Sequence, residues 1–382
     1  MTASDLIRDI DLGAADSIMR KIYSASFDAP YHRGRAISLL KRHDALFGSR
    51  TGVKPGIYSI PGRTELGGNH TDHNHGIVLA ASVNLDTIAA VTPTTDSRII
   101  IDSIGFDPVI VDIPDDPAVP ILPDERNFGT TSSLVLGIAE AFRAHGHRIG
   151  GFVANTDTDV RKGSGLSSSA AIEITIAVIL NDLYNGNAVS AVDLARFSQY
   201  AENTFFGKPS GLMDQTACAY GGIIGIDFKD PTEPVISDVS FSFHDAGYTL
   251  MVVDTGGNHA DLTPDYAAVP AEMKAVAAFF GRETCRDITV EDVLGSIPKL
   301  RRECGDRAVL RALHFLGETT RAARMHAALQ NHAMEEYLQL VQASGNSSAK
   351  FLQNVYAPGN PREQGITLGL AVTEDFLGGN GA

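Results

Sequence analysis

A run of glycines and serines, Gly163-Ser-Gly-Leu-Ser-Ser-Ser-Ala-Ala171, leads directly into an apolar stretch that predicts a buried helix over 170–181. Glycine lets the backbone approach an anion closely, and the first N–H groups of a helix carry positive partial charge. Ser167, Ser168 and Ser169 add hydroxyl groups that can donate hydrogen bonds or bind a metal ion. The pattern therefore indicates a phosphate site, although an ordinary turn with a serine cap fits it about as well.

This segment departs from the phosphate-binding motifs of several other nucleotide-binding folds. No GxxxxGK[ST] sequence occurs, because Gly207-Lys208 is followed by Pro209. The dinucleotide fingerprint fails at Ser168, where Gly or Ala is needed for close packing of strand and helix. The HRD, VAIK and DFG strings of protein kinases are also absent from the sequence. A phosphate site here must belong to another nucleotide-binding plan.

A second polar run follows Pro61-Gly-Arg63 and reads Gly67-Gly-Asn-His-Thr-Asp-His-Asn-His-Gly76. Such convergent donors and acceptors suit a ligand rich in hydroxyl groups. A metal site is the alternative, with ligands drawn from His70, Asp72, His73 and His75. Sugar recognition is favoured over metal binding, because the ligands of a zinc site usually come from separate segments of the chain. Further residues usually hold those ligands by hydrogen bonds. A solvated turn is disfavoured, since predicted strands lie close on both sides.

The third segment, residues 201–215, contains two carboxylates. Asp214 follows a tight Gly-Leu-Met turn, and Glu202 lies near the end of a predicted helix. A lone carboxylate is more often a surface or capping group than a catalytic one. The catalytic interpretation therefore requires Asp214 to meet an arginine and Glu202 to meet the serine loop.

Hydrophobic periodicity predicts the elements that position these segments. Helices are expected over residues 5–47 (as a pair), 132–145, 170–181 and 192–205, and strands over 57–60, 77–91, 98–102, from 152 onwards, over 221–227 and over 249–253. Residues 107–127, rich in Pro and Asp, predict a surface excursion, and residues 266–340 predict a helix-rich region. The turn segment Asp-Pro-Thr-Glu-Pro places a lobe boundary near residue 230.

The composition limits the classes of protein that the chain can belong to. Its 382 residues, 43% hydrophobic and 20% charged, predict a packed interior, arranged as two lobes or as one large α/β unit. A net charge of −15 argues against binding to nucleic acid or an anionic membrane. Cys218, Cys285 and Cys304 are too few and too scattered for a disulfide framework or a zinc pair, which favours the cytoplasm. The acidic N-terminus shows no signal peptide, and no apolar run is long enough to span a bilayer.

Taken in order, the three segments resemble the galactokinase branch of the GHMP kinases. PGRTELGGNHTDHNHG is similar to the sugar signature of that branch, GSGLSSSAA to its ATP loop, and GKPSGLMDQ to the segment with its catalytic aspartate. Weaker likenesses are found at 258–266 and 373–379. The resemblance implies an α+β fold with two lobes over 1–230 and 231–382. The first would be like ribosomal protein S5 domain 2, with a left-handed crossover, and the second ferredoxin-like.

The resemblance also implies a reaction and a role for each matching residue. The reaction is ATP-dependent phosphorylation of the anomeric hydroxyl of D-galactose. Asp214 would be the base, and Arg63 would keep it ionised and neutralise charge on the transferred group. ATP would contact Gly163, Ser164, Gly165, Leu166, Ser167, Ser168, Ser169 and Ser103. Mg²⁺ would bind Ser169 and Glu202. The sugar would contact Asn69, His70, Thr71, Asp72, Gly211 and Tyr266.

The sequence departs from the family pattern in three places. Asn69 stands where the family usually has Glu, so a different sugar, galacturonate first, is an alternative substrate. Arg161-Lys162 replaces a Pro and an apolar residue, and these two cations could assist ATP binding. The printed sequence ends at Ala382, where the family's third, Gly-rich motif is expected to begin. We therefore expect a truncated chain or one incomplete for catalysis, which leaves a non-catalytic sugar and ATP sensor as a second alternative. Expected partners are a small-molecule sugar and ATP, with the protein a monomer or weak homo-oligomer.

Overall fold

A computed structural model of the protein describes residues 2–48, 53–116, 118–161, 163–256 and 262–378. The chain divides into two compact units. Unit 1 comprises 1–63 and 82–221, and unit 2 comprises 64–81 and 222–382. The polar run 67–76 thus belongs to unit 2, whereas the serine loop and residues 201–215 belong to unit 1. The predicted lobe bounds, 1–230 and 231–382, stay a prediction.

Unit 1 combines a sheet with helices on both of its faces. Its helices are α1 (Ala3–Asp11), α2 (Asp16–Tyr23), α3 (Ala29–His43), α5 (Thr131–Ala144), α6 (Ser168–Asn185), α7 (Ala191–Tyr200) and α8 (Met213–Tyr220). Its strands are β3 (Arg98–Ser103), β4 (Val109–Asp112) and β5 (Phe152–Thr158). The longer strands β1 (Gly56–Gly67) and β2 (Ile77–Pro93) pair with each other and contribute residues to both units.

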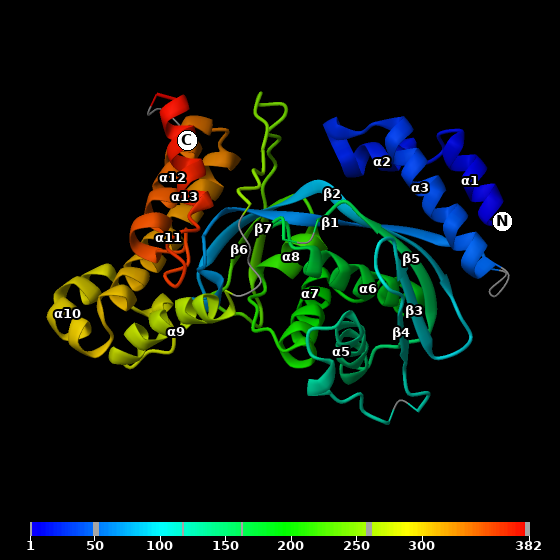
Figure 1. Ribbon diagram of the computed structural model, residues 1–382, viewed down its shortest axis with the longest axis horizontal. Coiled ribbons are helices and arrows are strands. Elements are labelled where there is room, and N and C mark those ends of the chain that lie inside the picture. Colours follow the sequence, from blue (N-terminus) through cyan, green and yellow to red (C-terminus); the bar gives the residue numbers. More distant parts are fainter. Residues whose placement is uncertain (1, 49–52, 117, 162, 257–261, 379–382) are drawn as a thin grey trace. The chain divides into compact units, whose positions relative to one another are not determined.

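The strands of unit 1 lie in the order β4-β3-β5-β2. β5 is parallel to β3 and antiparallel to β2, with Thr87 opposite Thr158. Because side chains alternate along a strand, β2 serves two cores. Ala89 and Val91 pack with α5, α6 and α7, whereas Ile88 and Ala90 pack with α1 and α3. Figure 1 shows these two groups of helices on opposite sides of the strands.

Helix α6 carries the serine loop at its start. Its helical residues extend the predicted range 170–181 to Ser168–Asn185, and apolar residues on all of its faces are buried. The helix ends at Gly186, whose φ of +58° is the left-handed conformation that favours glycine. A largely buried helix gives the loop before it a rigid base.

Unit 2 is mainly helical. It contains the strands β6 (Ile223–Asp227) and β7 (Val235–Asp238) and the helices α9 (Thr263–Phe279), α10 (Val290–Glu303), α11 (Asp306–Gln330), α12 (Met334–Ser347) and α13 (Gly365–Phe376). β6 is antiparallel to β7 and to the first residues of β2, with Ile77 opposite Asp227. One core joins α9, α10 and α11, and a second joins Leu66, Leu79, α11 and α12. The predicted helix-rich region is confirmed.

Three expected elements differ from the structure. Residues 249–253 are not a strand: Leu250, Met251, Val252 and Val253 are exposed, and a strand needs a neighbouring backbone for its hydrogen bonds. Residues 107–127 are not only a surface excursion, because β4 lies within them and pairs with β3. The expected N-terminal helix pair is three α-helices, α1, α2 and α3.

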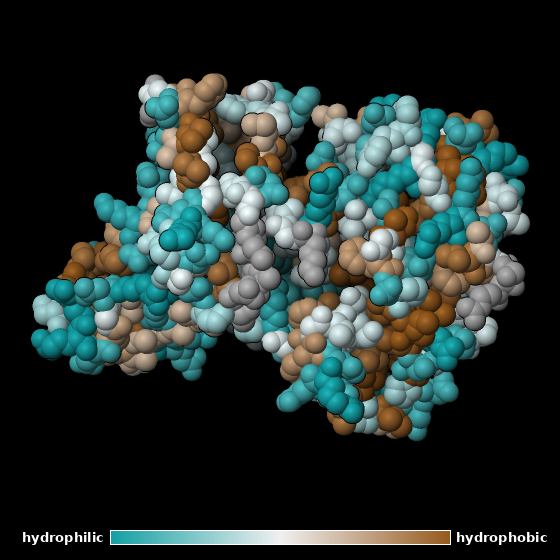
Figure 2. Space-filling model, in the orientation of Figure 1, coloured by the Kyte–Doolittle hydropathy of each residue, from teal (hydrophilic) through white to brown (hydrophobic). Residues whose placement is uncertain are grey.

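Helix α13 is the most exposed helix of unit 2. None of its residues is buried, and its apolar side chains give a brown surface over this helix in Figure 2. It is short, however: within the described ranges, no helix has both the length and the apolar character needed to cross a membrane.

Candidate active site

Asp214 and Arg63 form a two-pronged ion pair in unit 1. Asp214 lies in the first turn of α8, and Arg63 lies on β1. Arg63 Nε donates to Asp214 Oδ1 and Nη2 donates to Oδ2, both at 2.8 Å. The Asp214 side chain is 34% exposed, so a ligand can still reach the carboxylate. The arginine that the catalytic interpretation of Asp214 required is therefore in place.

The same arginine also fixes the serine loop. Arg63 Nη1 donates to the carbonyl oxygen of Gly165 at 2.7 Å, and the backbone N–H of Arg63 donates to that of Leu166 at 3.1 Å. The Ser167 hydroxyl donates to Asp214 Oδ2. Asp214 thus accepts three charge-assisted or hydroxyl hydrogen bonds from two segments. The structure brings together three residues that sequence analysis singled out separately.

The backbone of the loop suits the close approach of an anion. Gly163 and Gly165 have φ of +80° and +75°, and a Cβ at either would meet no atom within 4 Å. Both glycines therefore provide the left-handed backbone and leave the space beside it open. Ser168 and Ser169 are half-buried at the start of α6, whose first N–H groups have no partner inside the helix. This part of unit 1 can hold phosphate oxygens.

Glu202 lies in a buried cluster rather than against the serine hydroxyls. It is on the π-helical turn Ala201–Phe206, which continues the predicted helix 192–205 after α7. Glu202 Oε1 accepts from Lys208 Nζ at 2.6 Å, and Oε2 accepts from Gln215 Nε2 at 2.8 Å. The same amide nitrogen lies 3.2 Å from Oε2 of Glu173. Burial, and then the charge of Glu202, raise the pKa of Glu173 well above its ordinary value.

Sequence analysis missed Glu173, Lys208 and Gln215. Two signals were available: Gln215 directly follows Asp214, and Glu173 lies four residues after Ser169, on the same face of α6. Neither signal is specific without the fold, because glutamate and glutamine are common on helices.

The polar run of unit 2 is a compact turn. Thr71 is fully buried, and its hydroxyl lies 2.8 Å from the carbonyl oxygen of Gly68 and 2.9 Å from that of Ile77. His70 and His75 have φ of +57° and +64°, which places both in the left-handed region. Within the described residues, no group of three or more His, Cys, Asp or Glu side chains could hold a metal ion. The histidines of this run therefore do not gather as a zinc site.

Helix α11 holds this turn through two buried side chains one helical turn apart. His314 Nε2 lies 2.9 Å from the carbonyl oxygen of Asn69, and Glu318 Oε1 accepts from the backbone N–H of Gly68 at 3.1 Å. The Asn69 amide donates to Ser348 Oγ at 2.8 Å. Sequence analysis missed all three partners, because they follow the turn by more than 240 residues.

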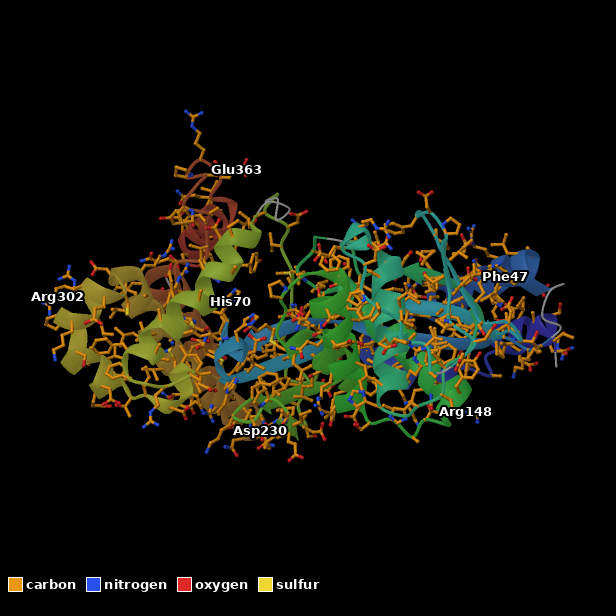
Figure 3. The ribbon with its side chains drawn as sticks, turned by 90° about the horizontal axis from the view of Figure 1, so that it is seen from below. Phe47, His70, Arg148, Asp230, Arg302 and Glu363 are labelled. Carbon is orange, nitrogen blue, oxygen red and sulfur yellow. The ribbon has the colours of Figure 1, made fainter. Side chains whose placement is uncertain are left out.

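The remaining predicted site residues lie as follows. Tyr266, on α9, is half exposed, and its ring centroid is 5.8 Å from that of His70, which Figure 3 labels beside this helix. Asp72 Oδ1 lies 3.8 Å from Nε2 of the adjacent His73. Gly211 precedes α8, and Ser103 Oγ lies 2.6 Å from Thr156 Oγ1. The expectations for Lys162, for 258–261 and for 379–382 fall outside the described residues.

Comparison with known proteins assigns the chain to a family. The family model for the N-terminal domain of GHMP kinases matches residues 133–222, and the galactokinase galactose-binding signature matches residues 41–93. Galactokinase from Streptomyces coelicolor is 32% identical over 286 residues, which cover 73% of this chain and 70% of that protein. The chain belongs to the galactokinase family.

Other members and a solved structure agree with this assignment. Galactokinase from Clostridium acetobutylicum is 27% identical over 304 residues, covering 75% of this chain and 73% of its own. The crystal structure of Lactococcus lactis galactokinase complexed with galactose has a TM-score of 0.69 at 23% identity, and the match covers 83% of this chain and 80% of that one. The predicted family, the sugar-kinase class and the α+β fold are confirmed.

The polar turn of this galactokinase-family chain is expected to lose stability in mild acid. Burial lowers the pKa of both His70 and His314, so the folded protein holds these rings neutral. Below the ordinary histidine pKa of about 6.5 the unfolded chain therefore takes up protons before the folded protein does. The free energy of unfolding should fall by up to about 1.4 kcal/mol per pH unit for each ring, from about pH 6.5 downwards.

Denaturant unfolding between pH 5 and pH 8 measures this slope. His314→Gln keeps a hydrogen-bonding side chain but removes one titrating ring, so its unfolding free energy should depend less steeply on pH. His244, which is exposed, provides the matched control variant His244→Gln. Equal slopes for the wild type and His314→Gln would contradict the expectation.

Proposed function

We propose that this protein transfers the γ-phosphoryl group of ATP to the anomeric hydroxyl of D-galactose, giving α-D-galactose 1-phosphate and ADP. The observation that carries the proposal is the contact of Asp214 with Arg63 and Ser167, at a glycine-rich loop that opens onto α6. Membership of the galactokinase family supports the choice of reaction. We also propose that the reaction takes place in the cytoplasm, where Cys218, Cys285 and Cys304 stay free thiols.

Phosphoryl transfer needs positioning and charge neutralisation more than covalent chemistry from the protein. The Asp214 carboxylate accepts the proton of the anomeric hydroxyl while that oxygen bonds to the γ-phosphorus and the bond to the β-phosphate oxygen breaks. Arg63 keeps the carboxylate oriented by two hydrogen bonds and places positive charge beside the transferred group. The loop 163–169 and the first N–H groups of α6 hold the phosphates.

The side chains proposed to bind Mg²⁺, Ser169 and Glu202, both offer oxygen ligands, and Glu173, one turn after Ser169 on α6, shares the Gln215 amide with Glu202. Mg²⁺ is commonly bound by one or two carboxylates together with water and substrate phosphates. The buried cluster around Glu202 also contains unpaired oxygens, because Glu173 Oε1 and Gln215 Oε1 have no hydrogen-bond partner among the described residues. When bound, the ion supplies positive charge to the phosphates of ATP. In the structure, Lys208 Nζ contacts Oε1 of the Glu202 carboxylate.

The side chains of Asn69, His70, Asp72 and Tyr266 are proposed to contact the sugar, and Gly211, which precedes α8, to do so through its backbone. Thr71 is buried and holds the turn through its hydroxyl. Asn69 favours galactose over galacturonate. Its amide nitrogen donates a hydrogen bond to Ser348 Oγ, whereas no described residue donates a hydrogen bond to its Oδ1. That oxygen can accept from a sugar hydroxyl as a glutamate would, but it repels the carboxylate of a uronic acid.

A sugar panel tests this specificity. We expect kcat/KM for galactose to exceed that for galacturonate by about a hundredfold, because an acceptor facing a carboxylate is unfavourable. Asn69→Asp adds a negative charge with little change in size and should widen the ratio. Comparable kcat/KM values for the two sugars in the wild-type protein would show that Asn69 has been assigned the wrong role.

The reaction itself is tested with purified protein, galactose, ATP and Mg²⁺. We expect ADP release that depends on galactose, with ³¹P NMR placing the phosphate on the anomeric oxygen. Calorimetry on the same sample measures the binding of galactose and of ATP. Binding of both without ADP release would reject catalysis in favour of a sensor, and absence of galactose binding in the folded protein would reject the sugar.

A further inference from the structure

Lys208 reaches from a surface loop into the buried cluster of unit 1. Its Nζ donates to Glu202 Oε1 at 2.6 Å, and its backbone N–H donates to the Glu202 carbonyl oxygen at 3.1 Å. The Glu202 side chain is only 3% exposed, whereas that of Lys208 is 54% exposed. A carboxylate with almost no access to water therefore has a cation placed on it from the solvent side.

The surroundings keep this lysine charged and close to the carboxylates. Burial lowers the pKa of Lys208, but the charge of Glu202 and the hydrogen bond to it outweigh the effect of burial, so that the net shift of the pKa is upward. Glu173 and Gln215 are almost fully buried, and each has one side-chain oxygen without a partner among the described residues. The side chains of Lys208 and Gln215 are the donors of this cluster, and they leave some of its oxygen atoms without a hydrogen bond.

An ammonium group and a divalent ion would need the same oxygen of Glu202. Gln215 donates to Oε2, which leaves Oε1 as the oxygen for a cation, and Lys208 contacts Oε1. The lysine can leave because its stem is flexible and its side chain is half exposed. A lysine ammonium is a compact charge that can pair equally with a phosphate oxygen.

We propose that Lys208 occupies the cation position of Glu202 in the nucleotide-free protein, competes there with the divalent ion that accompanies ATP, and turns to a phosphate oxygen when ATP binds. This inference rests on the proposed function, because it takes Glu202 as a ligand of that ion. Lys208 is then a positioning residue, since it prevents the ion from binding firmly before the nucleotide does.

Mn²⁺ binding to the nucleotide-free protein tests this competition. Mn²⁺ takes the same oxygen ligands as Mg²⁺, and the free ion can be counted by electron paramagnetic resonance. Lys208→Met keeps most of the side-chain length and removes the charge. We expect it to bind Mn²⁺ about tenfold more tightly than the wild type. The reason is that the variant lacks the positive charge that repels the ion at close range.

Two variants provide the controls. Lys208→Arg keeps a cation on Glu202 and should bind Mn²⁺ as the wild type does. Lys21→Met removes the same charge from an exposed position on α2 and should also leave the affinity unchanged. Unchanged affinity in Lys208→Met, or a gain as large in Lys21→Met, would overturn the inference.

Glu202→Gln separates this inference from the proposed function. In the presence of ATP we expect this variant to bind Mn²⁺ about tenfold more weakly, because a charged ligand is lost. Wild-type affinity in Glu202→Gln would reject the metal role of Glu202 and the inference with it. Weakened binding in Glu202→Gln together with unchanged binding in Lys208→Met would reject only the competition.

The wild-type protein gives an answer even if Lys208→Met does not fold. The ¹⁵N-labelled side-chain signal of Lys208, assigned by its loss in Lys208→Arg, should shift when a non-hydrolysable ATP analogue is added with Mg²⁺. A signal that does not change between the nucleotide-free and nucleotide-bound protein would overturn the inference.

Discussion

Replacing Asp214 with asparagine is expected to lower kcat by about a thousandfold, the typical contribution of a positioned base. Galactose affinity should stay within a few-fold of the wild type, because only interactions made in the transition state are lost. Both Asp214 oxygens accept from Arg63, and asparagine would turn an NH₂ group towards one of those donors. The variant therefore loses the proton acceptor and the orientation of the arginine together.

Steady-state kinetics and calorimetric titration with galactose measure the two quantities on one sample. Asp107→Asn makes the same chemical change at an exposed position of unit 1 and should leave both unchanged. An Asp214→Asn variant that keeps a tenth or so of the wild-type kcat would show that the base has been misassigned.

The parts of the site that could be predicted from sequence are those whose residues are adjacent in the chain. The serine loop combines glycines with positive φ and the start of a buried helix within nine consecutive residues, so its local conformation follows from residue type. Asp214 and Arg63 were found because each lies in a distinctive motif. Their contact joins residues 151 positions apart and needed the fold.

The missed residues look ordinary in the sequence. Glu318 and His314 lie on the long helix α11, where a polar residue usually faces solvent, yet both are fully buried against the turn at residue 69. In the same way, the apolar residues 249–253 suggested a strand, but in the structure they form none, and Leu250, Met251, Val252 and Val253 are exposed. The strand propensity of a residue describes the conformation that it favours, but tertiary contacts decide whether the residue adopts that conformation.

Arg63 connects more of the candidate site than any other side chain described above. Its guanidinium donates to both oxygens of Asp214 and to the Gly165 carbonyl, while its backbone N–H donates to that of Leu166. A guanidinium can do this because its donors form a fixed planar fork, whereas a lysine ammonium is a single point of charge. The Arg63 side chain is 15% exposed, so water cannot readily replace the donors that a substitution removes.

Arg63→Lys is therefore expected to lower kcat by about a hundredfold, and Arg63→Met by about a thousandfold or more, because the first keeps a charge and the second keeps neither charge nor donor. Kinetics with saturating ATP and galactose measure both variants, and their melting temperatures report the loss of loop contacts separately. Arg126, whose side chain is 88% exposed in its pair with Asp124, provides the control Arg126→Met, which should match the wild type. The activities of the two Arg63 variants relative to each other show how the residue acts. If Arg63 acted only by its charge, lysine would restore the rate, and if it acted only by holding the loop, both variants would lose the same activity at equal stability.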